Sequence, residues 1–256
     1  GMQRYFVEPG SMRGDTVVLR GSDAHHIAHV LRGRKGDRLI VSDGREREVL
    51  AEIADIAHGA VAVSVLEELE MNNEPAVDIW IAQSLPKADK MEAVIQKCTE
   101  IGAARLIPFV SARTVVQYDA NKEQKRLERW RKIAKEAAEQ AHRNRVPEVE
   151  APVSWKRLLE LVSRVEKAWI CCERGAEDGL RSALRRHADL LRPQGGVRGP
   201  LMVMIGPEGG YTEEEMAEAE RAGCGRVSLG PRILRTETAG MAALTCILYE
   251  YGQMGG

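Results

Sequence analysis

The sequence has few aromatic residues, no long hydrophobic run and almost no net charge. Aromatic side chains make up 4% of the 256 residues, and 37 Lys and Arg are balanced by 38 Asp and Glu. With 44% hydrophobic residues, this composition is typical of a globular protein and not of a disordered or fibrous one. The longest apolar stretches, such as Ala168–Cys172 and Leu201–Ile205, are far shorter than the roughly 20 residues of a membrane-spanning helix. We therefore expect a soluble cytoplasmic protein with no membrane partner.

The cysteines and histidines form no clear disulfide or metal-binding pattern. None of the five cysteines belongs to a CxxC pair, and buried free thiols are the preferred interpretation, Cys171–Cys172 included. His25 and His29 lie four residues apart on an expected helix, a spacing that can hold zinc. A third ligand is not evident and no HExxH glutamate accompanies them, so we expect no metal.

The first seventy residues are expected to form short strands and one helix. Gly-containing turns separate the strands, and the helix begins at Ser22 or Asp23 and runs to Leu31. The polar stretch Met71–Pro75 then divides a small β-barrel, residues 2–72, from a second domain at 76–256. The expected strands are Arg4–Val7, Thr16–Leu19, Arg38–Val41, Val49–Ile56 and Ala60–Leu66.

From Val77 onward, apolar strands alternate with helices, which is typical of a parallel α/β sheet. The expected strands are Val77–Ala82, Arg105–Phe109, Ala168–Cys172, Leu201–Ile205 and Arg226–Leu229. The expected helices are Lys90–Ile101, a long helix that opens near Asp119 or Asn121, Trp155–Val162, Gly179–Leu191, Glu213–Ala222 and a final helix from about Thr236. A Pro- and Gly-rich loop occupies residues 192–200.

The segment Gly206-Pro207-Glu208-Gly209-Gly210 follows a predicted strand, at the sheet edge where open α/β folds bind ligands. Its glycines let the backbone turn tightly and approach a flat or anionic ligand without interference from Cβ atoms. It matches neither GxGxxG nor GxxxxGK[ST], so both standard nucleotide motifs are absent here. From spacing alone, a plain turn and a binding loop are equally consistent with it.

A second segment, Leu229–Gly240, also joins a strand end to a helix start. Thr236 is placed to cap this helix, and Glu237 favours its positive N-terminus. These roles leave Arg232 and Arg235 unexplained, because cations near a helix N-terminus are unfavourable by roughly 0.3–1 kcal/mol. An anionic ligand at this position would remove the conflict.

Positive charge is concentrated in one part of the chain. Between Leu85 and Pro147 there are 14 Lys or Arg against 8 Asp or Glu, a local excess of six positive charges. Such a local excess is compatible with a nucleic-acid partner although the whole chain has a formal charge of −1.

Together these segments resemble the RsmE family of ribosomal RNA methyltransferases. The resemblance runs from Arg4 to the C-terminus and depends most on the GPEGG segment and on Leu234–Ala239, which reads LRTETA. It implies an α/β fold in which a PUA-like β-barrel precedes a SPOUT-type α/β domain with a C-terminal trefoil knot, working as a homodimer. The further matching segments are Leu85–Glu92, Ile95–Gly102, Ser111–Val116, Glu136–Gln140 and Arg143–Pro147.

The resemblance also implies methyl transfer from S-adenosylmethionine to N3 of a uridine in 16S rRNA of the small ribosomal subunit. Uridine N3 carries a proton at neutral pH, so Arg235 is expected to stabilise negative charge on the uracil oxygens and Glu237 to accept the proton. The implied cofactor-binding residues are Cys172, Gly206, Pro207, Glu208, Gly209, Gly210, Leu229, Gly230, Ile233 and Leu234. The cations expected to contact RNA phosphates around an exposed base are Arg4, Lys87, Lys90, Lys97, Arg113, Arg143, Arg145 and Arg232.

Two other functions stay open at this stage. The chain can be a catalytically silent RNA-binding or ribosome-assembly factor, against which the intact GPEGG and LRTETA segments argue. It can also be a SPOUT methyltransferase that acts on tRNA, and mapping of the modified nucleotide separates that function from the first.

Overall fold

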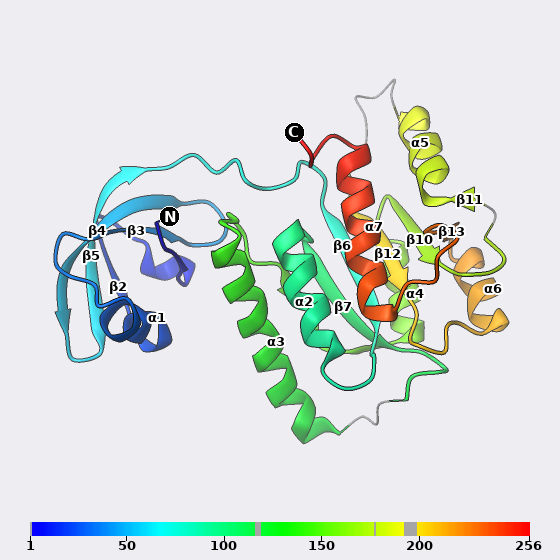
Figure 1. The fold of residues 1–256 in the computed structure, drawn as a ribbon, viewed down its shortest axis with the longest axis horizontal. Coiled ribbons are helices and arrows are strands. Elements are labelled where there is room, and N and C mark those ends of the chain that lie inside the picture. Colours follow the sequence, from blue (N-terminus) through cyan, green and yellow to red (C-terminus); the bar gives the residue numbers. More distant parts are fainter. Residues whose placement is uncertain (1, 116–118, 177, 192–198) are drawn as a thin grey trace. The chain divides into compact units, whose positions relative to one another are not determined.

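The computed structural model describes residues 2–115, 119–176, 178–191 and 199–256. Its contacts divide the chain into two compact units: unit 1 is Gly1–Glu74 with Lys135–Val146, and unit 2 is Pro75–Ala134 with Pro147–Gly256 (Figure 1). The predicted boundary at Met71–Pro75 lies beside this division. The prediction, however, assigned all residues after 75 to the second domain, whereas Lys135–Val146 packs with the N-terminal residues.

Unit 1 contains the five expected strands in one sheet, in the order β1-β3-β4-β5-β2. The strand β1 runs parallel to β3, and the other pairs are antiparallel. A closed barrel was predicted. Within the described residues the backbone hydrogen bonds instead form an open sheet, with β1 and β2 at its edges. The bounds are β1 Arg4–Phe6, β2 Thr16–Leu19, β3 Arg38–Ser42, β4 Glu48–Ala57 and β5 Ala60–Glu68.

The core of unit 1 lies against one face of this sheet. Alternate residues of the strands, such as Val17, Val49 and Val63, are fully buried, as the period of two in a half-buried strand requires. The predicted helix is also present, as α1 Gly21–His25 continued by a π-helical turn His26–Val30, and Ile27 joins the same core.

Unit 2 is built on an eight-stranded sheet whose main path is β11-β13-β10-β12-β6-β7-β8, with β9 paired to β7. All pairs in it are parallel. The five predicted strands are β6 Ile79–Ser84, β7 Arg105–Val110, β10 Lys167–Cys171, β12 Leu201–Ile205 and β13 Gly225–Ser228. Three two-residue strands were not predicted: β8 Glu148–Val149, β9 Val153–Ser154 and β11 Asp178–Gly179.

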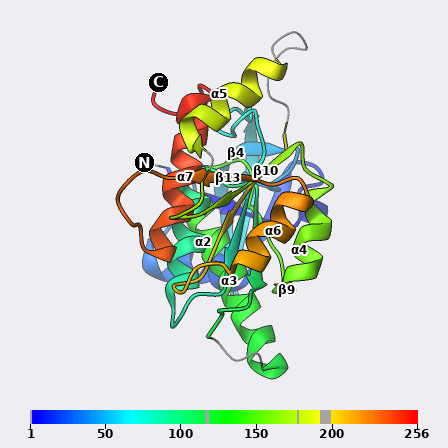
Figure 2. The same ribbon diagram turned by 90° about the vertical axis from the view of Figure 1, so that its right-hand side faces the viewer.

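Helices cover both faces of the unit 2 sheet, as a buried parallel sheet requires (Figure 2). Residues of α4 and α6 pack into one core with β7, β10 and β12. The helix α7 contacts α2, β6 and β12 on the other face, and α5 packs on α7. The bounds are α2 Lys90–Ile101, α3 Ala120–Gln140, α4 Trp155–Val162, α5 Leu180–Leu191, α6 Glu213–Arg221 and α7 Thr236–Glu250.

Local signals place several helix ends where they were predicted. Thr212 and Glu215 form the expected capping box at the start of α6. Gly102 ends α2 with a φ of +133°, a conformation that side chains other than glycine rarely adopt. Of the predicted loop at 192–200, residues 192–198 lie outside the described part of the chain.

Candidate functional site

Three loops follow adjacent parallel strands and line one pocket of unit 2. The strands β13, β10 and β12 are neighbours in the sheet, so their carboxyl ends meet at the same edge. The loops after them, together with residues from α2 and the loop after β7, enclose a space of about 1180 Å³. That volume is ample for a ligand of nucleoside size.

The residues implied as cofactor-binding all line this pocket. They come from all three loops and are Cys172, Gly206, Pro207, Glu208, Gly209, Gly210, Leu229, Gly230, Ile233 and Leu234. The predicted catalytic pair Arg235 and Glu237 and the cations Lys90, Arg113 and Arg232 line it as well. The GPEGG and LRTETA segments are therefore two walls of a single site.

Sequence reasoning did not assign Asp178, Tyr211 or Glu213 to this site, although all three line the pocket. Each comes shortly after a strand that contributes a loop: Asp178 in β11 after β10, Tyr211 between β12 and α6, and Glu213 at the start of α6. Their positions just after these strands could have indicated that they belong to the site. The prediction omitted them because they lie outside the GPEGG and LRTETA motifs.

Close packing at Gly206 explains why glycine begins the first motif. A Cβ atom at this position would lie 3.1 Å from the ring of Tyr211, which itself packs against Trp155 with ring centroids 5.8 Å apart. Burial raises the pKa of the Tyr211 hydroxyl well above its ordinary value, so this side chain stays neutral. Gly206 therefore lets the loop lie directly on a fixed aromatic ring.

Arg113 fastens the loop after β7 to the GPEGG segment. Its Nη1 donates hydrogen bonds to the carbonyl oxygens of Gly209 at 2.9 Å and Tyr211 at 3.2 Å. We predicted Arg113 as a phosphate contact, and the structure places part of its guanidinium on backbone carbonyls. The residue is still exposed.

Lys90 lies between two carboxylates at the pocket. Its Nζ is 3.5 Å from Glu208 Oε2 and 3.8 Å from Glu237 Oε2. Partial burial acts to raise the pKa of Glu208, but hydrogen bonds from the Lys87 amide and from Lys90 outweigh it and hold that pKa below its ordinary value. Glu208 is thus an anion at neutral pH, and Lys90 forms ion pairs with Glu208 and Glu237 in this structure.

Thr236 does not cap α7 as predicted. The N-cap residue is Arg235, which makes no side-chain capping hydrogen bond. Thr236 is the first residue of the helix, is 7% exposed, and donates from Oγ1 to the carbonyl oxygen of Gly206 at 2.7 Å. Its hydroxyl therefore joins the two motifs to each other.

Cys172 contributes its backbone to the third loop. Its amide donates to the carbonyl oxygen of Val227 at 3.0 Å, which continues the pairing of β10 with β13. Burial raises the pKa of the Cys172 thiol, so the thiol stays protonated at neutral pH and is a poor nucleophile.

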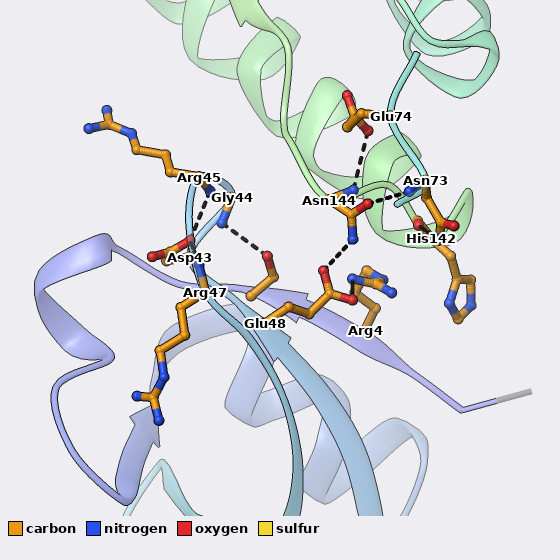
Figure 3. A network of polar contacts seen from close by, with 11 residues as sticks. Arg4, Asp43, Gly44, Arg45, Arg47, Glu48, Asn73, Glu74, His142 and Asn144 are labelled. Atoms are coloured by element: carbon orange, nitrogen blue, oxygen red, sulfur yellow. Dashed lines mark hydrogen bonds and ion pairs between the residues drawn. The ribbon is translucent and has the colours of Figure 1, made fainter. Parts of the chain in front are cut away.

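Two cations predicted to contact RNA are instead buried within unit 1. Arg4 is 5% exposed and pairs with Glu48, and Arg143 is 3% exposed and pairs with Glu74. Asn144 links the two pairs, because its side-chain amide donates to Glu48 and its backbone amide to Glu74 (Figure 3). The prediction that Arg4 and Arg143 contact phosphates is therefore corrected, since a buried, paired guanidinium does not reach an RNA backbone.

The other predicted phosphate contacts remain at the surface. Exposed positions are occupied by Lys87, Lys97, Arg113, Arg145 and Arg232. The structure thus leaves these cations accessible to a polyanion.

Neither a metal centre nor a membrane-spanning helix is found in the part of the chain that the structure describes. No group of three or more His, Cys, Asp or Glu side chains there is arranged to hold a metal ion. The rings of His25 and His29 lie with centroids 4.9 Å apart, but they have no third ligand among those residues. No described helix is both long and apolar enough to cross a bilayer.

Family profiles cover most of the chain. One described as an RNA methyltransferase domain matches residues 72–248, and one described as an RNA methyltransferase PUA domain matches residues 19–66. The two matched ranges correspond to most of the second domain and of the N-terminal sheet.

Individual proteins are similar over nearly the whole length. Ribosomal RNA small subunit methyltransferase E of Bacillus subtilis (strain 168) is 40% identical over 255 residues, which cover 97% of each chain. The protein of the same name from Synechocystis is 34% identical over 95% of this chain and 76% of its own.

A solved structure shares the fold. The crystal structure of a ribosomal RNA small subunit methyltransferase E from Neisseria gonorrhoeae, bound to S-adenosyl methionine, superimposes with a TM-score of 0.82. It is 30% identical, and the match covers 97% of this chain and 98% of that one. Sequence motifs, fold and these likenesses agree, and the chain belongs to the family of ribosomal RNA small subunit methyltransferase E.

Proposed function

We propose that this protein transfers the methyl group of S-adenosylmethionine to N3 of a specific uridine in 16S rRNA of the small ribosomal subunit. The observation that carries the proposal is the single pocket in which the GPEGG loop, the LRTETA segment and the loop after β10 meet. The relative from Neisseria gonorrhoeae was crystallised with S-adenosyl methionine, which supports the same cofactor here.

The residues of the pocket fit this cofactor. Gly206 and Gly209 line the space and, having no Cβ, present backbone to it. Leu229, Ile233 and Leu234 supply apolar surface for the faces of adenine. When bound, S-adenosylmethionine supplies an activated methyl group, so the protein has to provide alignment and a nucleophilic nitrogen.

Arg235 and Glu237 are the residues proposed to act on the uracil. Both line the pocket at the start of α7, and Arg235 is exposed there. Its guanidinium can stabilise negative charge on the uracil oxygens once N3 loses its proton. The Glu237 side chain is 23% exposed and lines the pocket, so its carboxylate can take that proton, with the Lys90 ammonium 3.8 Å from Oε2.

RNA binding is proposed to use the N-terminal PUA domain and the exposed cations of the basic stretch. The exposed cations proposed to contact phosphates are Lys87, Lys97, Arg113 and Arg145 in the basic stretch and Arg232 after β13, while Lys90 contacts the carboxylates of the pocket. The few aromatic residues, 4% of the chain, favour phosphate contacts over base stacking.

Four finer features complete the proposal. The C-terminal part of unit 2 is proposed to form the trefoil knot of SPOUT enzymes, with the loops after β12 and β13 as its crossings. The protein is proposed to work as a homodimer and in the cytoplasm. The small ribosomal subunit or its 16S rRNA is the proposed partner.

The function is tested by mapping methylation. Mass spectrometry of 16S rRNA from a strain lacking the gene, with and without a plasmid copy, should show one N3-methyluridine that depends on the gene. Calorimetric titration should show binding of S-adenosylmethionine. No binding at millimolar cofactor would favour the silent RNA-binding or assembly factor, and a methylated nucleotide in tRNA instead of rRNA would favour the tRNA enzyme.

The role of Arg235 is tested by Arg235→Ala. We expect its methylation rate to fall well beyond threefold with little change in thermal stability, because an exposed guanidinium is removed. Arg221→Ala, an exposed arginine of α6 outside the pocket, is the matched control and should keep the wild-type rate. A rate for Arg235→Ala within about threefold of wild type would remove the assigned role.

A further inference from the structure

A buried glutamine lies behind the pocket, at the end of the strand next to β12. Gln83 is 0% exposed and stands beside Ile205 in the register of β6 with β12. Its Nε2 donates to the carbonyl oxygen of Ser84 at 2.8 Å and to Thr236 Oγ1 at 2.9 Å. Gln83 does not line the pocket, yet it contacts a residue that joins the two motifs.

The direction of every hydrogen bond in this group is determined by the chemistry of its ends. The carbonyl oxygen of Ser84 only accepts, so the atom of Gln83 that faces it is the amide nitrogen. The carbonyl oxygen of Gly206 also only accepts, so Thr236 donates its hydroxyl proton there and accepts from Gln83. The result is one chain of hydrogen bonds, from Gln83 through Thr236 to Gly206, which we call the Gln83–Thr236 link.

The other end of the Gln83 amide is unsatisfied. Its Oε1 is buried and has no hydrogen-bond partner among the described residues. Leaving a buried acceptor unpaired costs roughly 1–3 kcal/mol, whereas an apolar side chain of similar shape would avoid that cost. Folding alone therefore does not favour glutamine at this position, and departures of this kind are expected at functional sites.

The link acts at the point where α7 begins. The N-cap residue Arg235 makes no side-chain capping bond, and the hydroxyl of Thr236 connects this helix start to the loop after β12, beside the ion pair of Glu237 with Lys90. Arg235 and Glu237 flank Thr236 directly in the sequence. Any shift of Thr236 relative to Gly206 would move both of them with respect to the GPEGG loop.

We infer that Gln83 and Thr236 are positioning residues that hold Arg235 and Glu237 in register with the cofactor loop. The inference rests on the proposed methyl transfer, for which misplacement of reacting groups by 1 Å can reduce the rate by up to about 10²-fold. In this role the side chains of Gln83 and Thr236 act on the reaction through the start of α7.

The test uses the full-length protein with three substitutions in the link. Thr236→Val keeps the shape and removes the hydroxyl, Thr236→Ser keeps the hydroxyl, and Gln83→Met removes both polar atoms of the amide. Thr245→Val is the matched control, because Thr245 lies on the same helix and its hydroxyl donates only to the helix's own Met241 carbonyl in the described contacts. The measurements are kcat and KM for methyl transfer, calorimetric affinity for S-adenosylmethionine, Tm, and amide hydrogen exchange.

We expect Thr236→Val and Gln83→Met to lower kcat by about tenfold, with cofactor affinity within about threefold of wild type. Thr236→Ser should recover most of the rate. Gln83→Met should have a Tm no lower than wild type, so that activity falls while stability does not. Exchange should become faster in 206–211 and 235–239 together in Thr236→Val, and should be unchanged in Thr245→Val.

A kcat within twofold of wild type in both Thr236→Val and Gln83→Met would overturn the inference, as would a serine variant no more active than the valine variant. If Thr236→Val does not fold, Gln83→Met decides. If the wild-type protein methylates no rRNA, the proposed function fails. Hydrogen exchange then decides about the link independently, because unchanged exchange at both segments would overturn it.

Discussion

Glu139 is a partly buried carboxyl of unit 1 whose surroundings move its pKa close to neutral pH. Its Oε2 accepts a hydrogen bond from the Phe6 amide at 3.3 Å. The pKa of this carboxyl is raised from 4.5 to about 7, chiefly by burial. Lys135 and the Phe6 amide act to lower the pKa, and the nearby Asp23 and Glu136 act to raise it. The folded protein therefore holds a proton at Glu139 that the unfolded chain releases at lower pH.

This raised pKa gives a signed prediction for Glu139→Gln. Between pH 4.5 and about 7 the folded state binds the extra proton, so the free energy of unfolding of the wild type falls as the pH rises through that window. The amide variant lacks this loss. We expect it to match the wild type at pH 4 and to be more stable at pH 8, by at most about 3 kcal/mol.

Urea unfolding at the two pH values measures the difference. Glu128→Gln is the control, because Glu128 is exposed on α3, the helix that also carries Glu139. Its effect on the free energy of unfolding should be small and the same at pH 4 and pH 8. A Glu139→Gln protein less stable than wild type at pH 8 would show that Glu139 is ionised and held by Lys135.

Residue type alone was a poor guide to the roles of Arg4 and Arg143. Both were predicted as phosphate contacts because they are cations in an RNA-binding context. Their burial depends on Glu48 and Glu74, which are distant from them in the sequence, and on Asn144, which contacts both carboxylates. Nothing local in the sequence distinguishes such a buried pair from a surface cation.

Among the secondary-structure elements, those with strong local patterns were predicted well. The helices α2 and α4 and the strand β12 have the predicted bounds, because periodicity and terminal residues act within one element. The short strands β8, β9 and β11 were missed, since two residues carry no period. The link between Gln83 and Thr236 joins residues 153 positions apart, so no local pattern could have shown it.

The loop after β12 gives a prediction about glycine. Gly206→Ala would place a Cβ atom 3.1 Å from the Tyr211 ring, and that ring is held by Trp155. The loop must therefore shift, and we expect affinity for S-adenosylmethionine to fall by about tenfold, roughly 1.4 kcal/mol.

Calorimetric titration of the cofactor measures this effect. Gly10→Ala is the control, because a Cβ atom there meets nothing within 4 Å and its φ is not positive. Equal cofactor affinity in Gly206→Ala and wild type would mean that the loop tolerates the side chain and that Gly206 does not shape the pocket.

For the whole molecule, the family and its α/β fold followed from two motifs and the alternation of strands and helices. The division of the chain did not, because α3, Ala120–Gln140, begins in unit 2 and ends within the segment Lys135–Val146 of unit 1. Helical periodicity runs through that boundary without a break.

RNA binding is a property of the whole surface and should depend on salt. Lys97 is exposed on α2 within the basic stretch, and neutralising one phosphate contact reduces the slope of log K against log salt by roughly 0.7–0.9. We expect Lys97→Ala to weaken binding to a 16S rRNA fragment severalfold at low salt and to make the slope shallower.

Filter binding at several salt concentrations measures the slope. Lys156→Ala, an exposed position on α4 outside the basic stretch, should leave affinity and slope unchanged. If Lys97→Ala and Lys156→Ala behave alike, Lys97 makes no phosphate contact.

Unit 1 includes Lys135–Val146, a segment that is translated long after its other residues, and this order affects folding during synthesis on the ribosome. When Glu74 has emerged from the tunnel, the partners that Asn144 and Arg143 supply to Glu48 and Glu74 have not yet been translated. The amino-terminal sheet cannot close this polar network until Pro75–Ala134 has also been made. A nascent or truncated chain that stops at Glu74 therefore has incompletely paired carboxylates. We expect such a fragment to be less stable as an isolated domain than the same sheet in the full chain.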